Sequence, residues 1–444
     1  MDVVVIGAGV AGLAAARDLS LAGRTVTVLE ARGRLGGRIL TVRGGAGEAP
    51  MELGAEFLHG AAEETMRIVR AAKLDLVRLP EHHLTARDGR FHSSGDFWEL
   101  IESSGKRIAA LIKRRRGRDL SYADFLARSG LSSERRQMLR DFAEGYDAAH
   151  TELLSAAAMV EGGGGLSDDE DDGQHRLVDG YDGVVRWLRG GLDADRVTVR
   201  LSTIASEIRW KRGDVTVRCQ GPTGAKLESV RARAVIITVP LALIKAGQPR
   251  FVPAMPAVER ALDKLVEGQV FKIVLQFREA FWDEPGFMKK RMERGARASR
   301  LNFVHAYQQP VPTWWSAAPQ KLTRLTGWAG GPRAEALLAE RTSARLDRAL
   351  DSLAGALGVP RKVVDGQFDS CAMHDWQKDP FARGAYTYAR VGGLSAQKRL
   401  ARPVSGTVWF AGEAVSADET GTVAGAIASG RKAAGMLTKT RREW

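Results

Sequence analysis

The sequence predicts a two-domain α/β protein. A strand–helix–strand unit opens the chain, strand-like and helical segments alternate further on, and 444 residues are too many for one ordinary hydrophobic core. Hydrophobic residues make up 44% of the chain and charged residues 27%, as in ordinary globular proteins. The composition therefore excludes the fibrous and disordered classes.

The first element is an apolar strand at residues 3–6, and an Ala/Leu-rich helix at residues 10–22 follows it, with Gly23 as the expected C-cap. Residues 25–29 form the next parallel strand. Residues 60–160 have mainly helical periodicity, for example at residues 65–79 and 133–142. This order predicts a parallel sheet first and a helix-rich region after it.

From residue 197 to 239 apolar and polar residues alternate as in strands, and residues 235–239 form a further buried strand that Pro240 ends. The remaining expected elements are strands at 271–277, 324–329 and 407–411 and helices at 333–357 and 422–437. Two low-complexity patches, residues 162–165 (glycine) and 168–172 (acidic), predict a surface loop. An alternative is that the acidic run attracts cations towards an entrance.

The net charge of +13 would favour polyanionic partners if the positive residues shared one face. Most of them are spread along the chain, and the one dense cluster comprises Lys106, Arg107, Lys113, Arg114, Arg115, Arg116 and Arg118. Because an apolar stretch interrupts the cluster, a solvated helix face is the favoured interpretation, and a nucleic-acid or anionic-lipid patch is the alternative.

Two cysteines, Cys219 and Cys371, leave no disulfide framework and no Cys-x-x-Cys pair, which fits a reducing compartment. The chain opens on a strand, without the pattern of a signal peptide. No apolar run approaches the ~20 residues of a membrane span. We therefore expect a soluble cytoplasmic protein; the sequence does not predict an oligomeric state.

Gly7, Gly9 and Gly12 form a G-x-G-x-x-G turn between the first strand and its helix, with Ala8, Val10 and Ala11 between them. The glycines permit a tight turn, a close approach to a pyrophosphate and close helix–strand packing. Glu30 ends the second strand, where a carboxylate can accept hydrogen bonds from a ribose diol. These features predict a Rossmann-type dinucleotide site that disfavours NADP.

The segment that follows Glu30 contains Ala31, Arg32, Arg34, Gly36, Gly37 and Arg38. Arg38 is expected to contact the pyrophosphate. The segment matches the signature E-A-R-x-R-x-G-G-R, and here the sequence resembles the flavin-containing amine oxidase family, which includes monoamine oxidases, polyamine oxidases and flavin histone demethylases. The resemblance covers essentially the whole chain and implies an FAD cofactor.

The resemblance implies further cofactor contacts in three places: Gly54, Ala55, Glu56 and Phe57; Ile204 at the adenine; and Gly412 and Glu413 with Gly421, Thr422 and Val423. Residues 235–243 resemble the family's V-I-x-x-x-P-L strand. Since both chain ends would meet one cofactor, the domains are expected to be interleaved. The FAD-binding domain would comprise residues 1–80, 195–250 and 390–444, and an α+β substrate-binding domain residues 81–194 and 251–389, as in the amine oxidase and glutathione-reductase-like FAD folds.

On the reacting side, Tyr386 matches the first of two aromatic residues that stand beside the flavin in the family. Thr422 replaces the second, as on the polyamine-oxidase and demethylase side of the family. Ala385 stands where monoamine oxidases have the cysteine that bonds the flavin, so the FAD is expected to be held non-covalently.

Three further residues are candidates for the active site. Lys272 lies in an apolar strand, where a lysine is costly unless its ammonium reaches a polar site, and it matches the family lysine that holds a water beside the flavin. An edge strand facing solvent is the alternative. Trp376 resembles the tryptophan near the flavin ring, although a lone Trp is more often core. His59 is a candidate polar contact to the substrate nitrogen, with a structural role as the alternative.

The predicted function is oxidation of an amine to an imine, with hydride transfer to FAD and reoxidation by molecular oxygen to give hydrogen peroxide. An L-amino-acid oxidase of the same fold is a rival, but its carboxylate-binding arginine is replaced by Glu56 and Phe57. A desaturase is disfavoured by Lys272 and Tyr386. The rival outside the enzymes is a flavin-bearing nucleic-acid-binding module that uses the basic cluster. The expected partners are a small-molecule amine and oxygen, with nucleic acid disfavoured and no metal site indicated.

Overall fold

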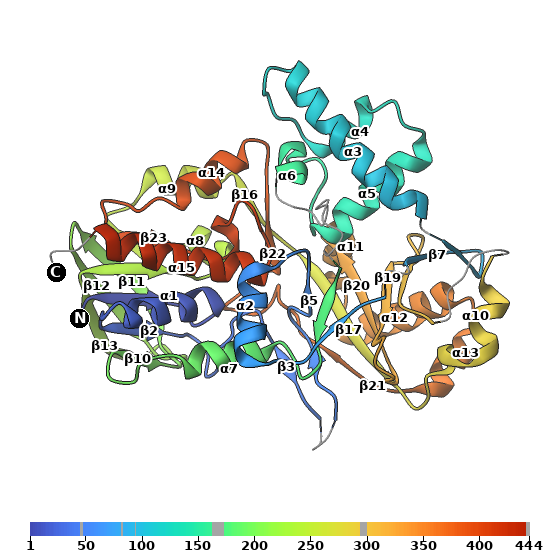
Figure 1. Ribbon diagram of the computed structural model, residues 1–444, viewed down its shortest axis with the longest axis horizontal. Coiled ribbons are helices and arrows are strands. Elements are labelled where there is room, and N and C mark those ends of the chain that lie inside the picture. The colour runs from blue at the N-terminus through green and yellow to red at the C-terminus, as the bar shows by residue number, and fades with distance from the viewer. Residues whose placement is uncertain (45–47, 81–82, 94, 162–172, 294–299, 441–444) are drawn as a thin grey trace.

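The computed structural model describes residues 1–44, 48–80, 83–93, 95–161, 173–293 and 300–440. Its elements form a region built on a parallel sheet, a region built on a seven-stranded sheet, and a helical lobe (Figure 1). The predicted α/β fold with a parallel sheet is confirmed.

The first region contains a five-stranded sheet in the order β10-β2-β1-β14-β23, and every neighbouring pair is parallel. β1, β2 and β14 are buried along their whole length because the sheet is covered on both faces, which explains their nearly continuous apolar sequences. The strands are β1 (Val3–Ile6), β2 (Val26–Leu29), β10 (Val197–Arg200), β14 (Ala234–Ile237) and β23 (Val408–Phe410).

Helices cover one face of this sheet, and a second sheet with short helices covers the other. The first face packs against α1 (Val10–Leu21), α2 (Glu63–Ala72), α7 (Asp182–Gly190) and α15 (Val423–Thr440). The other face packs against the sheet β13-β12-β11-β15 and three helices. These elements are β11 (Ile204–Lys211), β12 (Asp214–Gln220), β13 (Lys226–Ala232), β15 (Arg250–Val252), α8 (Leu241–Lys245), α9 (Pro256–Leu262) and α14 (Gly393–Leu400).

The second region contains a seven-stranded sheet in the order β21-β17-β20-β19-β18-β7-β8, in which only the β18–β7 pair is parallel. Its strands are β7 (His83–Arg87), β8 (Arg90–Ser93), β17 (Val270–Phe277), β18 (Phe303–His305), β19 (Thr313–Ser316), β20 (Arg324–Gly330) and β21 (Phe368–Met373). Its helices are α10 (Pro285–Arg291), α11 (Gly331–Ala339), α12 (Thr342–Leu357) and α13 (Arg361–Gln367).

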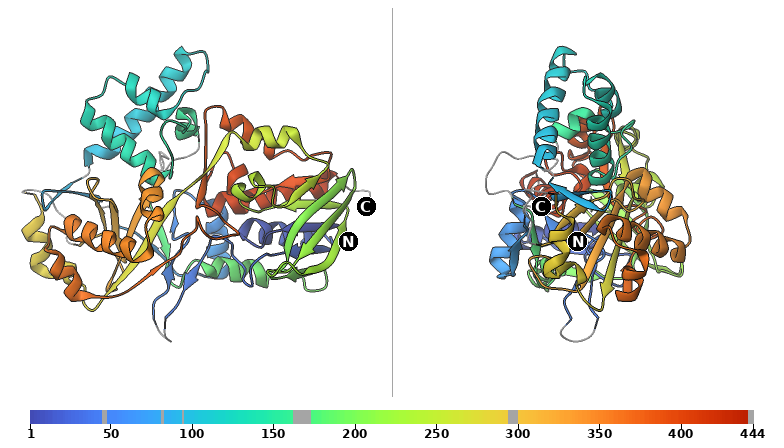
Figure 2. Two further views of the ribbon diagram at one scale, coloured as in Figure 1. Left: turned by 180° about the vertical axis from the view of Figure 1, so that it is seen from behind. Right: turned by 90° about the vertical axis from the view of Figure 1, so that its right-hand side faces the viewer.

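The helical lobe has its own core and projects from the rest of the molecule in both views of Figure 2. It consists of α3 (Gly95–Arg114), α4 (Tyr122–Arg128), α5 (Ser133–Tyr146) and α6 (Ala156–Glu161). The C-terminal end of α5 returns to the seven-stranded sheet, where it packs against β20.

Short sheets lie between the two large regions (Figure 1). They pair β3 (Thr41–Val42) with β4 (Met51–Glu52), β9 (His175–Leu177) with both β5 (Phe57–Leu58) and β6 (Leu76–Arg78), and β16 (Leu265–Gly268) with β22 (Tyr386–Ala389). The short sheets bring segments from distant parts of the chain to one place.

Three expectations about the elements were wrong in detail. The helix expected at residues 65–79 ends at Ala72, because Lys73 is left-handed (φ 52°) and the following residues 76–78 pair with β9 as a strand. The helix expected at 333–357 is two helices, separated where Glu340 is extended. Strands β6, β7 and β8 interrupt the helix-rich region expected at 60–160.

The strands of the parallel sheet all come from the segments predicted for the FAD-binding domain, and those of the seven-stranded sheet from the segments predicted for the substrate domain. Two helices depart from that division, because α7 packs against α1 on one face of the parallel sheet and α9 packs on the other face, although residues 81–194 and 251–389 were assigned to the substrate domain. The division itself stays a prediction.

In the part of the chain that the structure describes, every helix is too short or too polar to cross a lipid bilayer. The acidic run 168–172 and the glycines 162–165 lie outside the described residues.

Candidate functional site

A cavity of about 1520 Å³ lies where the two regions and the helical lobe meet. Sites for one small molecule are typically about 300–1,000 Å³, so this cavity has room for a dinucleotide and a substrate. Most of the predicted site residues line it: Gly7, Gly9, Val10, Ala11, Glu30, Ala31, Arg32, Gly36, Gly37, Arg38, Gly54, Ala55, Glu56, Phe57, His59, Ile204, Lys272, Trp376, Tyr386, Gly412, Glu413, Gly421, Thr422 and Val423. Ala8, Gly12 and Arg34 do not line it.

The glycine turn has the geometry that a pyrophosphate site needs. Gly7 has φ +103°, and a Cβ on Gly12 would overlap the carbonyl oxygen of Gly7. Gly9 precedes α1, which has no capping side chain and no acidic residue in its first turn. The N–H groups at this helix end are therefore left to an anionic ligand.

Glu30 lies at the end of β2 beside this turn, and its side chain is buried. Its carboxylate accepts hydrogen bonds from the Ala8 N–H (2.7 Å) and the Arg32 N–H (2.9 Å). Arg32 in turn donates to Asp379 Oδ1 (2.6 Å), which ties the loop to the segment that carries Trp376. Ala8 thus contributes its backbone N–H to the site's framework.

Arg34 has a different place from the one expected. Its guanidinium donates to the carbonyl oxygens of Leu35 (3.1 Å), Gly37 (2.9 Å) and Ile39 (3.0 Å). It therefore stabilises the conformation of this loop and lies outside the lining of the cavity. Its guanidinium does not face a ligand.

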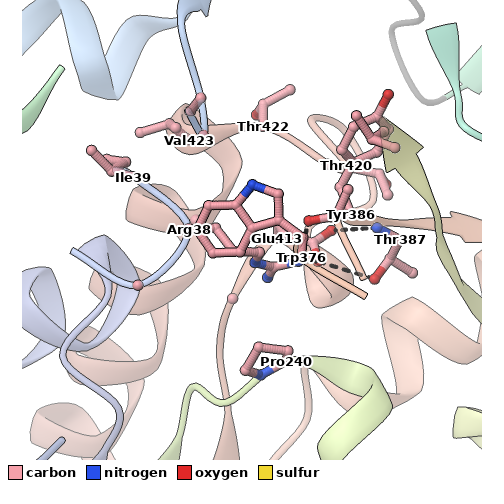
Figure 3. Close-up of a pocket in the computed structure, with 18 of the residues that line it drawn as sticks. Arg38, Ile39, Pro240, Trp376, Tyr386, Thr387, Glu413, Thr420, Thr422 and Val423 are labelled. Carbon is pink, nitrogen blue, oxygen red and sulfur yellow. Dashed lines mark hydrogen bonds and ion pairs between the residues drawn. The ribbon is translucent and has the colours of Figure 1, made fainter. Parts of the chain in front are cut away.

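Arg38 pairs with two carboxylates, one of which, that of Glu413, is labelled in Figure 3. Its Nη1 donates to Glu267 (2.8 Å), Glu413 (3.0 Å) and the Ala385 carbonyl (2.7 Å). Burial, opposed by Arg38 and assisted by Glu413, raises the pKa of Glu267 to about 7. Glu413 also accepts hydrogen bonds from the N–H (3.2 Å) and hydroxyl (3.0 Å) of Thr387. Arg38, expected at the pyrophosphate, thus also joins the first and last cofactor segments.

Lys272 is buried in β17, between β20 and β21, so the alternative of a solvent-facing edge strand is wrong. Its ammonium lies 2.7 Å from Glu56 Oε2 and donates to the Gly54 carbonyl (3.1 Å). The same carboxylate accepts from Trp315 Nε1 (3.0 Å) and pairs with Arg176 (3.0 Å). Although burial would raise the pKa of Glu56, the charges of Lys272 and Arg176 lower it, so Glu56 is ionised.

Aromatic side chains form part of the cavity wall, and one of them, Trp328, is the cross-strand neighbour of Lys272. Tyr386 and Trp328 stack at 13° with ring centroids 6.5 Å apart. The Tyr386 hydroxyl donates to the Tyr146 carbonyl (2.6 Å), and Trp328 Nε1 donates to the Gly145 carbonyl (2.9 Å). Both rings are thus held by the otherwise unpaired carbonyl groups at the end of α5.

Trp376 is 4% exposed, and its indole N–H donates to the Leu53 carbonyl (2.9 Å). It lines the cavity and also packs in the core, so both roles considered for it describe its position. Thr422 lines the cavity too, but its hydroxyl accepts from the Gly425 N–H (2.9 Å) and donates to the Glu419 carbonyl (2.9 Å). It therefore caps the start of α15.

His59 lies in the wall with its ring edge-on to Phe57 (5.9 Å) and Tyr146 (5.7 Å). Its Nδ1 lies 3.1 Å from Gln174 Nε2. Burial lowers the pKa of His59 to about 4, so the ring is neutral at pH 7. A neutral imidazole can bond an amine without repelling it.

Sequence reasoning missed Glu267, Arg176, Trp315, Trp328 and Asp147. Arg176, Trp315, Trp328 and Glu267 contact predicted residues through their side chains, and Asp147 lines the cavity. Arg176 could have been anticipated from Glu56, because a carboxylate that is buried needs a cation near it. No sequence pattern indicates Glu267, Trp315, Trp328 or Asp147.

The basic cluster at residues 106–118 lies on α3 and the turn after it, in the helical lobe, and its side chains are exposed apart from the half-buried Arg115. None of its members lines the cavity. This position fits a solvated helix face.

The model of the family described as flavin containing amine oxidoreductase matches residues 10–437. "Probable polyamine oxidase 4" of Arabidopsis thaliana is 29% identical over 97% of this chain and 85% of its own length. Wild-type putrescine oxidase bound to putrescine has the same fold, with a TM-score of 0.79 and 22% identity over 99% of both chains. Cyclohexylamine oxidase from Brevibacterium oxydans IH-35A does too, with a TM-score of 0.78, 22% identity and 99% of both chains covered. The chain therefore belongs to the family of flavin-containing amine oxidoreductases and is a flavin-dependent enzyme.

Proposed function

We propose that this enzyme binds FAD non-covalently and oxidises an amine to an imine, with molecular oxygen as the final oxidant and hydrogen peroxide as the product. The observation that supports it is that one cavity contains both the glycine turn with Glu30 and the wall formed by Lys272, Trp376 and Tyr386. FAD held by the glycine turn and Glu30 would supply the two-electron redox chemistry that amine oxidation requires.

FAD, with its pyrophosphate and adenosine, fits the residues better than a mononucleotide does. The open N-terminus of α1 suits a pyrophosphate, and Glu30, at the end of the next strand, suits the ribose of the adenosine half. Non-covalent binding is supported by Ala385, which has no nucleophile, and neither Cys219 nor Cys371 lines the cavity.

The protein's own part in the reaction is to bind, orient and exclude water. Tyr386 and Trp328 give the amine a flat apolar wall, and their hydrogen bonds to α5 keep both rings in place. Neutral His59 can accept or donate a hydrogen bond at the substrate nitrogen. Lys272 places its side-chain nitrogen beside the Gly54–Glu56 segment, where Glu56 and the Gly54 carbonyl hold it in position.

The test is to purify the holoenzyme, record its visible spectrum and add amines without oxygen. We expect a yellow protein that amines bleach, and peroxide formation when air is readmitted. A colourless protein that FAD cannot reconstitute would overturn the cofactor assignment. Bleaching by L-amino acids alone would favour the amino-acid oxidase instead, and bleaching by no amine would refute amine oxidation.

A further inference from the structure

One carboxylate oxygen in the cavity wall is buried without a hydrogen-bond partner among the residues that the structure describes. Asp147 directly follows α5 and lines the cavity, and its Oδ2 is buried without a hydrogen bond from any described residue. Two buried acidic side chains of this wall have counter-charges instead: Glu56 pairs with Lys272 (2.7 Å), and Asp141 pairs with Arg333 (2.8 Å). A buried carboxylate without a cation is costly, so such a group points to a ligand that supplies one.

The backbone around Asp147 is held rigidly. The Asp147 N–H donates to the Ala143 carbonyl (3.0 Å) as the C-cap of α5. A Cβ on Gly330 would lie 2.6 Å from the Gly145 oxygen, and a Cβ on Gly268 would lie 2.6 Å from the Ala148 oxygen. Because glycines let both strands press against this turn, the carboxylate has a defined position in the wall.

The surroundings of Asp147 favour a cation. It lies at the C-terminal end of a helix of 14 residues, which carries partial negative charge. Tyr146 and Phe142 stack beside it with ring centroids 5.2 Å apart, and such rings can hold methylene groups and an ammonium. Burial raises the pKa of Asp147 to about 7, which is the effect expected where no positive group lies near.

Tyr386 relates Asp147 to the reacting end of the cavity. The base of its ring is close to Gly421, since a Cβ there would lie 3.2 Å from a ring carbon, and its hydroxyl bonds the carbonyl of Tyr146. The ring therefore spans from a predicted cofactor segment to the residue before Asp147. A ligand that lies along this ring would have one end at the predicted cofactor segment and the other end near Asp147.

We propose that Asp147 binds a second ammonium group of the substrate, remote from the carbon that is oxidised, and so selects diamines or polyamines over monoamines. This inference rests on the proposed amine oxidation. The remote ammonium pairs with Asp147, while the reacting amine lies neutral at the other end of Tyr386.

The test compares butane-1,4-diamine with pentylamine, which replaces the remote ammonium by a methyl group of similar size. For the wild-type holoenzyme we expect a higher kcat/KM for the diamine. Asp147→Asn should lower that value by about 30-fold or more, the fold-change that corresponds to the roughly 2 kcal/mol lost with a buried charge pair, and should change the value for pentylamine little. Asp141→Asn is the matched control on the same helix, and it should keep the ratio of the two substrates.

A binding measurement separates recognition from turnover. With the flavin already reduced by dithionite, the diamine should raise the Tm of the wild type and not that of Asp147→Asn, and an unchanged visible spectrum would show that the variant is folded. Equal losses for both substrates, or no preference in the wild type, would overturn the role of Asp147 while amine oxidation stands. A wild type that oxidises neither amine nor any other would refute the proposed function itself.

Discussion

The two halves of the cavity are built in different ways. On the side of the parallel sheet, backbone groups and glycines shape the wall, and the carboxylate of Glu30 and the guanidinium of Arg34 are bonded to that backbone. On the side of the seven-stranded sheet, side chains from several distant segments form the wall, as in the contacts of Glu56 with Lys272, Arg176 and Trp315.

This difference indicates on which side of the cavity a substitution can change substrate choice without changing cofactor binding. A wall of backbone tolerates few substitutions, because its shape depends on the absence of side chains. A wall of side chains can change its chemistry one residue at a time while the strands stay the same. The following changes test that contrast.

The largest effect is expected from Gly12→Val on the cofactor side. The new side chain would overlap the Gly7 carbonyl and press on Thr238, so helix α1 could not pack against β1. We expect complete loss of bound flavin, measured as the visible absorbance of the purified protein. Gly105→Ala in α3, where a Cβ meets nothing within 4 Å, is the control and should keep the colour.

A smaller effect, confined to the side of the seven-stranded sheet, is expected from Lys272→Met. Removing this ammonium leaves Glu56 with Arg176 as its cation. We expect the flavin to stay bound, turnover with oxygen to fall at least about tenfold, and the free energy of unfolding to fall by about 1–3 kcal/mol. Unchanged kinetics would remove Lys272 from the reaction.

The double variant Lys272→Met with Glu56→Gln sharpens this test. Once this carboxylate is neutral, the buried guanidinium of Arg176 has lost its counter-charge. The free energy of unfolding should therefore fall further than in Lys272→Met, while turnover stays low. Recovery of turnover would mean that Lys272 acts only by balancing Glu56.

Stability should also depend on pH through Asp147. Its pKa in the folded protein is about 7 against an ordinary value of 3.8, so the native state binds the proton more tightly than the unfolded chain does. The wild type therefore loses stability, relative to Asp147→Asn, as the pH rises from about 4 to 7. Without amine, we expect the variant to be more stable at pH 8, by on the order of 1–4 kcal/mol, and equal to the wild type at pH 4. Denaturant unfolding at both pH values measures it, and an equal difference at the two would refute the assignment.

The smallest effect is expected from Tyr386→Phe. The ring stays in the wall, and only the hydrogen bond to the Tyr146 carbonyl is lost, which is worth about 1 kcal/mol. Flavin content should not change, and kcat/KM should fall only a few-fold, whereas Tyr386→Ala should damage amine oxidation far more. Loss of flavin from either variant would place Tyr386 in cofactor binding.

Much of the cofactor side could be predicted from sequence because its constraints are local. Gly7, Gly9, Gly12 and Glu30 belong to one strand–helix–strand unit, and residue type alone tells which backbone positions need glycine. Helix ends were predicted less well. Helix α2 ends before Lys73 because residues 76–78 form a strand that pairs with β9. This pairing partner is distant in the sequence, so no local pattern indicates it.

Sequence patterns alone were enough to predict the strand–glycine turn–helix that opens the molecule and the α/β class, and its motifs indicated the residues that we propose as the cofactor site. Only the tertiary structure decided that Lys272 pairs with Glu56, that Glu267 joins Arg38 and Glu413, and that Asp147 lies in the cavity without a cation. The physical reason is that a turn's conformation follows from the residues within it, whereas a buried charge depends on which distant segments the packing brings beside it.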